Sequence, residues 1–186
     1  FLSEDLILAL LIVQFIGFPA ALGFGKLGQK WGVRPSIFLA IALYLLITLW
    51  GTMMTRKEEF YVLAISIGLV QGGIQALSRS YFARLIPRHR TAEYFGFYNM
   101  LGKFATIIGP SLMGLVGLTV KRILLPPAPS AAELVHYGQV ASRWSIGSVG
   151  LLFLMGGVLF YFVDEKKGRA EATRLSDDGA VPSSSG

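Results

Sequence analysis

The sequence has 186 residues, of which 53% are hydrophobic and only 15% are charged, and its formal net charge is +6. Soluble domains usually carry about a quarter charged residues, so this composition excludes an ordinary soluble protein. The absence of cysteine excludes disulfides and thiol chemistry, and the two distant histidines argue against a metal site, so we expect no metal and no cofactor. The basic residues stand in short clusters beside apolar runs, which favours a lipid bilayer over nucleic acid as partner.

Five apolar runs are each long enough to cross the hydrocarbon layer of a membrane, which takes about 18 or more residues in a helix. Within lipid the backbone must satisfy its own hydrogen bonds, and no run alternates with the period of two that a membrane β-strand shows. We therefore predict an all-α membrane protein with five transmembrane helices. They cover about residues 6–25, 36–55, 60–79, 95–120 and 145–163, in one bundle over residues 1–164.

The segments between and after the later runs are polar. Ser130 and Glu133 form a capping-box pattern, so residues 131–141 are predicted either as a short helix at the outer surface, next to the interfacial Trp144, or as an ordinary loop. Residues 165–186 are rich in charged and small residues and are predicted to form a disordered cytoplasmic tail.

Lysine and arginine are concentrated after the first run, between the third and fourth runs, and after the fifth run. By the positive-inside rule these positions are cytoplasmic, so the first run begins outside and the chain ends inside. Glu4 and Asp5 precede the first run, where a signal peptide would carry basic residues, and the chain begins with Phe1. We therefore expect a segment of a longer membrane protein.

The third run contains two glutamines, Gln71 and Gln75, which are four residues apart and share one helix face. An unpaired amide in hydrocarbon is costly, so both side chains are expected to face the interior of the bundle. They either join neighbouring helices through hydrogen bonds or line a route for a polar substrate. Gly68 and Gly72 form a G-x-x-x-G pattern that lets two helices approach closely.

The fourth run repeats this combination of polar and small residues. Asn99 and Lys103 are four residues apart, and Lys103 lies about 12 Å into the run by helix rise. An ammonium group at that depth either faces a partner or a wet cavity, or its stem reaches back to the cytoplasmic headgroups. The residues predicted to pack or bend this helix are Gly102, Gly109, Pro110 and Gly114.

The first connection reads GKLGQKWGVR, and its glycines Gly25, Gly28 and Gly32 predict a tight turn. This connection resembles the cytoplasmic loop motif of the major facilitator superfamily, roughly G-x-L-x-D-R-x-G-x-R/K. Gln29 stands where that motif has an acidic residue, so no ion-paired latch is expected there. The segments GGIQALSRSYFARLIP and EYFGFYNMLGKFATIIGP, in this order, resemble the branch of autophagy-related vacuolar amino-acid effluxers and their bacterial relatives.

The resemblance implies that the five runs are the eighth to twelfth helices of a twelve-helix transporter, in a bacterial cytoplasmic membrane. The implied partner is the N-terminal half of the same transporter, and the implied substrate is a small polar solute, amino acids among them, moved by alternating access. Gln71, Gln75, Asn99 and Lys103 would face the central cavity. The residues implied for the cytoplasmic loop motif and gate are Gly25, Gly28, Gln29, Gly32, Arg34, Arg79, Arg84, Arg90 and Glu93.

Other classes of function are open at this point. A membrane scaffold or receptor that retains the transporter fold would place Lys103 and the glutamines in contact with neighbouring helices only. A membrane enzyme has no support, since the runs contain no Ser/His/Asp set, metal cluster or phosphate loop. Glu93 is expected to pair with a nearby arginine, either in the gate or as a surface pair worth well under about 1 kcal/mol. No carboxylate lies in the middle of a run, so proton coupling either uses the other half or is absent.

Overall fold

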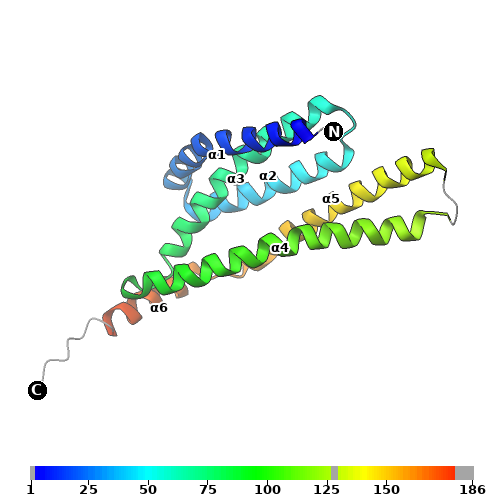
Figure 1. The fold of residues 1–186 in the computed structure, drawn as a ribbon. Coiled ribbons are helices and arrows are strands. Elements are labelled where there is room, and N and C mark those ends of the chain that lie inside the picture. The colour runs from blue at the N-terminus through cyan, green and yellow to red at the C-terminus, as the bar shows by residue number, and fades with distance from the viewer. Residues whose placement is uncertain (1–2, 127–129, 179–186) are drawn as a thin grey trace, which may run out of the picture.

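The computed structural model describes residues 3–126 and 130–178 and is helical throughout the elements that it contains (Figure 1). These elements are α1 (Ser3–Trp31), α2 (Val33–Met53), α3 (Lys57–Ala83), the short 3-10 helix η1 (Arg88–Arg90), α4 (Thr91–Leu124), α5 (Ala131–Tyr161) and α6 (Glu165–Asp178). In the described part of the chain, five helices are long and apolar enough to cross a membrane. The prediction of an all-α membrane protein with five transmembrane helices is therefore confirmed.

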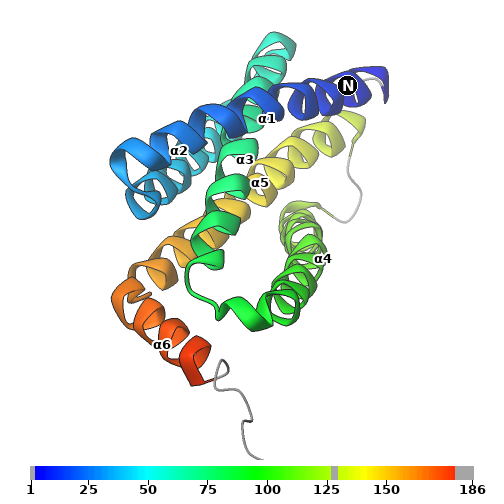
Figure 2. The ribbon, with the colours of Figure 1, turned by 90° about the vertical axis from the view of Figure 1, so that its left-hand side faces the viewer.

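The five long helices form two groups that meet where α2 contacts α5 (Figures 1 and 2). In the first group α1 packs most extensively on α3, and α2 contacts both. In the second group α4 packs on α5. The N-terminal end of α1 lies at the same end of the molecule as the α2–α3 and α4–α5 connections, and α6 lies at the opposite end (Figure 1).

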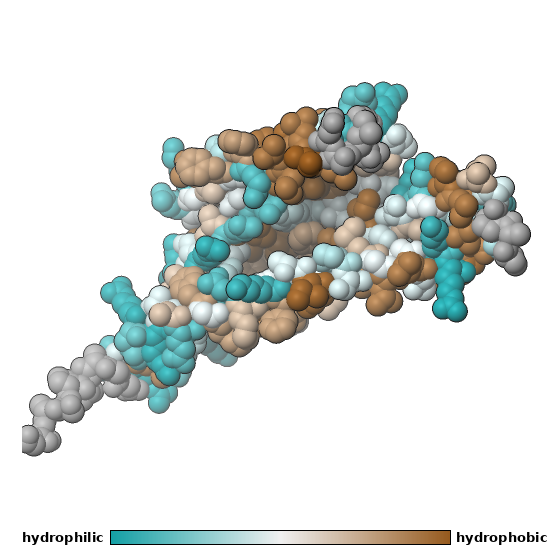
Figure 3. Space-filling view, in the orientation of Figure 1, coloured by the Kyte–Doolittle hydropathy of each residue, from teal (hydrophilic) through white to brown (hydrophobic). Residues whose placement is uncertain are grey.

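Most large apolar side chains of the long helices are exposed. Phe15 is 78% exposed and Leu118 is 72% exposed, on α1 and α4 respectively. Figure 3 shows hydrophobic residues over α1 and hydrophilic residues gathered around α6. Because a chain in water buries such continuous apolar surface, this distribution agrees with helices whose outer faces contact lipid or further helices.

The connection between α1 and α2 is a single residue, Gly32, whose φ of 95° lies in the left-handed region that glycine adopts without strain. The structure differs from the predicted three-glycine turn, because Gly25 and Gly28 belong to the last turns of α1. A β-carbon at Gly28 would lie 2.6 Å from Cδ2 of Leu77. Gly28 therefore serves close packing of α1 on α3, not chain reversal.

Helix α5 begins earlier than the fifth predicted run, which starts at about residue 145. The Glu133 carboxylate accepts a hydrogen bond from the Ser130 amide at 2.8 Å, and the Ser130 hydroxyl accepts one from the Glu133 amide. This capping box opens a helix that continues without a break to Tyr161. Residues 131–141 thus form the first turns of α5, and neither a separate surface helix nor a loop.

The tail also differs from the prediction, because residues 165–178 form helix α6, while residues 179–186 lie outside the described residues. Asp164 caps the helix, since its Oδ1 accepts hydrogen bonds from the amides of Lys166 and Lys167 at 3.0 and 3.1 Å. Glu165 pairs with Arg169 one turn later. These local bonds compensate for a composition that is otherwise typical of disorder.

We expect α6 to lose stability in acid. The hydrogen bond from the Lys167 amide is the main cause that lowers the pKa of Asp164 below the ordinary aspartate value. Because the folded-state pKa is lowered, the stabilisation is complete above the ordinary value and is lost as the pH falls through the lowered one.

Hydrogen exchange of the α6 amides in the full-length protein will measure this effect. Exchange, corrected for its intrinsic pH dependence, should speed up across that acidic range. Asp164→Asn keeps an acceptor oxygen but cannot titrate, so it should remove the pH dependence. The same acid profile in Asp164→Asn and in the unsubstituted protein would contradict the assignment.

Candidate functional site

The closest helix contact in the described chain joins α1 and α3 along their small residues. A β-carbon at Gly68 would lie 2.9 Å from the carbonyl oxygen of Val13, and one at Gly72 would overlap the carbonyl oxygen of Gly17. The two backbones are therefore in direct contact, as the G-x-x-x-G pattern of α3 favours. This contact fixes which side chains of the two helices become neighbours.

A groove of about 310 Å³ lies along this contact. Its lining contains three side-chain amides, Gln14 from α1 and Gln71 and Gln75 from α3. Gln71 is half-buried, whereas Gln14 and Gln75 are exposed. None of the three amides has a hydrogen-bond partner in the described part of the chain. The other lining residues are Val13, Gly17, Ala21, Gly72, Ala76 and Arg79.

These amides give the groove a definite chemistry. A carboxamide offers both donors and an acceptor, so a cluster of three can hold either end of a zwitterion or the hydroxyl groups of a neutral solute. The exposed Arg79 adds a positive charge at one end of the groove. The arrangement suits recognition of a small polar molecule and supplies no nucleophile or general base.

Gln14 is the polar groove residue that the sequence analysis did not single out. It is isolated in the apolar run LLIVQFIG, so its own helix offers no second amide four residues away. A lone amide in a long apolar run was the available signal, since such residues rarely face lipid. Only the packing of α1 on α3 shows that it joins the other two glutamines.

Asn99 and Lys103 lie on α4, and the structure does not bring them into this groove. Both side chains are exposed, and Lys103 has no ion pair among the residues that the structure describes. The C-terminal half of α4 packs on α5, where the Ser145 hydroxyl donates to the Met113 carbonyl at 2.9 Å. In the N-terminal half, the face that carries Asn99 and Lys103 is exposed.

The glycines of α4 that were predicted to pack have no close partner within residues 3–126 and 130–178. A β-carbon at Gly102, Gly109 or Gly114 would meet nothing within 4 Å. The helix also continues through Pro110 from Thr91 to Leu124. The described chain therefore leaves these three glycines without a close neighbour, and their packing role stays a prediction.

Among the residues implied for the cytoplasmic gate, some make defined contacts. Arg34 donates to the carbonyl oxygen of Tyr161 at 2.8 Å, which ties the start of α2 to the end of α5. Arg90 pairs with Glu93 at 2.9 Å, and the two side chains are 54% and 64% exposed. That pair has the geometry of a surface ion pair, which contributes little stability. Gln29 is exposed and makes no hydrogen bond through its side chain in the described structure.

Comparison with known proteins gives one consistent result. The family described as vacuole effluxer Atg22 like matches residues 2–119. The MFS-type transporter YxiO of Bacillus subtilis (strain 168) is 33% identical over 164 residues, which cover 88% of this chain and 34% of YxiO. Autophagy-related protein 22-2 of Aspergillus niger is 29% identical over 156 residues, which cover 77% of this chain and 23% of that protein. No solved structure matches the chain.

The matched region contains the glycine contact, the amide groove and most of α4. The chain spans about a third or less of the length of these relatives. YxiO is named as an MFS-type transporter, and the matching family is described as a vacuole effluxer family, so the names that state an activity state transport. The resemblance found in the sequence is confirmed, and the chain belongs to the Atg22-like family of MFS transporters.

Proposed function

We propose that the full-length protein is a secondary transporter that moves a small polar solute, amino acids being the first class to test, by alternating access. The observation that carries the proposal is the groove between α1 and α3, where Gln14, Gln71 and Gln75 lie together within otherwise apolar helices. Unpaired amides at such a position are costly unless a ligand, water or another helix satisfies them.

The second set of polar residues lies on α4. α3 and α4 contact each other near their connection, where the ring of Phe82 lies 4.8 Å from that of Tyr98. Beyond that contact the two helices separate (Figure 2). In the proposed transporter, the glutamines of α3 and the Asn99 and Lys103 side chains of α4 line different walls of the central cavity.

The proposed orientation follows from the basic residues. The two connections α1–α2 and α3–α4, the helix ends beside them, and α6 lie at one end of the molecule (Figure 1), and together they carry most of its lysine and arginine. We assign this end to the cytoplasm, in a bacterial cytoplasmic membrane. The partner is the rest of the transporter, which would cover the open face of α4 and complete the cavity between two helical halves.

Transport by reconstituted full-length protein tests the proposal. Uptake of radiolabelled amino acids into proteoliposomes should fall at least about tenfold in a Gln71→Leu/Gln75→Leu variant, because the apolar side chains leave polar groups of the substrate unpaired. Gln139→Leu is the matched control, since this exposed glutamine lies on α5 and outside the groove.

The outcomes separate transport from a scaffold or receptor role. A large loss in the double variant with normal flux in Gln139→Leu supports the amide groove as part of the route. Equal flux in all three proteins would remove the groove from the transport path. Absence of flux for amino acids and for other small polar solutes, in protein that elutes as a folded species, would favour a protein that retains the fold without transporting.

A further inference from the structure

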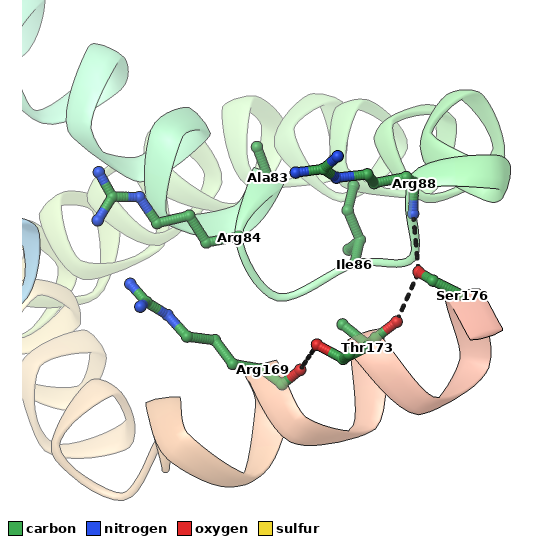
Figure 4. A pocket seen from close by; sticks show the side chains of 8 residues that line it. Ala83, Arg84, Ile86, Arg88, Arg169, Thr173 and Ser176 are labelled. Atoms are coloured by element: carbon green, nitrogen blue, oxygen red, sulfur yellow. Dashed lines mark hydrogen bonds between the residues drawn. The ribbon is translucent and has the colours of Figure 1, made fainter.

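Helix α6 is docked against the connection between α3 and α4 (Figure 4). Gly168 lies close to the side chain of Leu85, since a β-carbon there would be 2.8 Å from Leu85 Cδ2. Ile86 and Ala172 are buried in the same contact, and the Arg88 amide donates to the Ser176 hydroxyl at 3.3 Å. The docking therefore combines a small apolar contact with one long hydrogen bond, and it holds α6 beside the last turn of α3.

A pocket of about 430 Å³ lies between the docked helix and this connection. Three arginines are among its lining residues, and each comes from a different element: Arg84 caps α3, Arg88 begins η1, and Arg169 lies on α6. Figure 4 shows Arg84 and Arg169 extending toward the same side from opposite walls of the pocket. The remaining lining residues are Ala83, Ile86, Ala172, Thr173 and Ser176, so the lining contains no carboxylate.

The positive charge of this pocket is only partly compensated by the described residues. Arg169 pairs with Glu165, but a guanidinium has five N–H donors, and one carboxylate leaves several of them free. Arg84 and Arg88 form no side-chain ion pair in the described structure. Holding three arginines around one cavity costs free energy through repulsion, and a bound anion would remove that cost.

The hydroxyl groups of the lining do not provide the anion-binding donors. Thr173 donates to the Arg169 carbonyl at 3.0 Å, and Ser176 donates to the Ala172 carbonyl at 2.7 Å. Their protons are therefore engaged within α6, and the guanidinium groups are the free donors. Guanidinium forks match the oxygen geometry of phosphate better than that of a spherical anion.

We propose that this pocket binds a phosphate group, which bridges Arg169 of α6 to Arg84 and Arg88 of the α3–α4 connection. The group belongs either to the headgroup of an anionic lipid or to a free phosphate. The positive-inside rule accounts for basic residues near the ends of these helices, but it does not account for the convergence of three separate elements on one cavity. A bridging phosphate stabilises the docked position of α6.

The experiment measures hydrogen exchange of the α6 amides in the full-length protein, with and without each of two probes. The first probe is inorganic phosphate added to protein in a neutral detergent. The second is phosphatidylglycerol, in nanodiscs of phosphatidylcholine with and without this lipid. The variant is Arg84→Gln/Arg88→Gln, and the control is Arg174→Gln, an exposed arginine of α6 outside the pocket. Arg169→Gln is a second variant that leaves the α3–α4 connection unchanged, in case the double variant does not fold.

At least one probe should slow exchange of α6 about tenfold in the unsubstituted protein and in Arg174→Gln, and should have little effect in the pocket variants. Protection by phosphate in detergent identifies a free phosphate as sufficient, and protection only with phosphatidylglycerol identifies the lipid headgroup. Absence of protection by both probes overturns the proposal. Equal protection in the pocket variants, or its loss in Arg174→Gln, also overturns it, because either result indicates diffuse charge attraction.

Discussion

Gly72→Val will separate α1 from α3 and lower the free energy of unfolding of the full-length protein by about 3 kcal/mol or more. A β-carbon at Gly72 would overlap the carbonyl oxygen of Gly17 and would lie 2.6 Å from its carbonyl carbon. These neighbours are backbone atoms, so no side-chain rotation relieves the overlap and α1 itself must move. Unfolding by sodium dodecyl sulfate in mixed micelles measures the loss.

A control on another helix separates this overlap from the general effect of replacing glycine. A β-carbon at Gly156 of α5 would meet nothing within 4 Å in the described structure, so Gly156→Ala should leave the free energy of unfolding nearly unchanged. Gly68→Ala should lie between the two, because the nearest atom would be the Val13 carbonyl oxygen at 2.9 Å. If Gly72→Val were as stable as Gly156→Ala, the close backbone contact would be wrong.

The apolar runs predicted the number and type of the long helices but not their ends. α5 begins at Ala131, well before the predicted run, because its first turns mix polar and small residues that no hydropathy window selects. The capping box at Ser130 and Glu133 was the local signal for that start. α6 was predicted as disordered from its charge, yet the cap at Asp164 and the docking on Leu85 stabilise it. Capping and docking are specific contacts, and composition does not report them.

The candidate site shows the same division between local pattern and packing. The spacing of Gln71 and Gln75 places both on one helix face, and the structure puts both in the groove with α1. The contribution of Gln14 depends on the register between α1 and α3, which the Gly17–Gly72 contact sets. The sequence spacing predicts which residues share a face of one helix. The register between two helices depends on how their side chains pack together.

The Asn99–Lys103 face of α4 is open in the described chain, and the chain spans about a third of YxiO. Spacing indicates that the two side chains share a face, and exposure indicates that no described helix covers it. Substitution of Lys103 in the full-length protein distinguishes the two environments open to this face, which are the central cavity and the cytoplasmic headgroups.

Lys103→Gln will lower the rate of transport per unit substrate concentration at least about 30-fold if its ammonium contacts substrate or an acidic partner inside the cavity. Removing one member of a desolvated charge pair costs about 2 kcal/mol or more, which corresponds to that ratio. Lys103→Arg keeps the charge and should retain part of the activity. Lys121→Gln is the matched control, because this exposed lysine lies on α4 near its other end. The alternative, in which Lys103 reaches back to the cytoplasmic headgroups, predicts flux within about twofold of the unsubstituted protein in both Lys103 variants, since an ammonium at the membrane surface contacts neither the substrate nor an acidic partner in the cavity. Initial rates in proteoliposomes, measured over a range of substrate concentrations, distinguish the two, and near-normal rates in Lys103→Gln would remove this lysine from the proposed cavity.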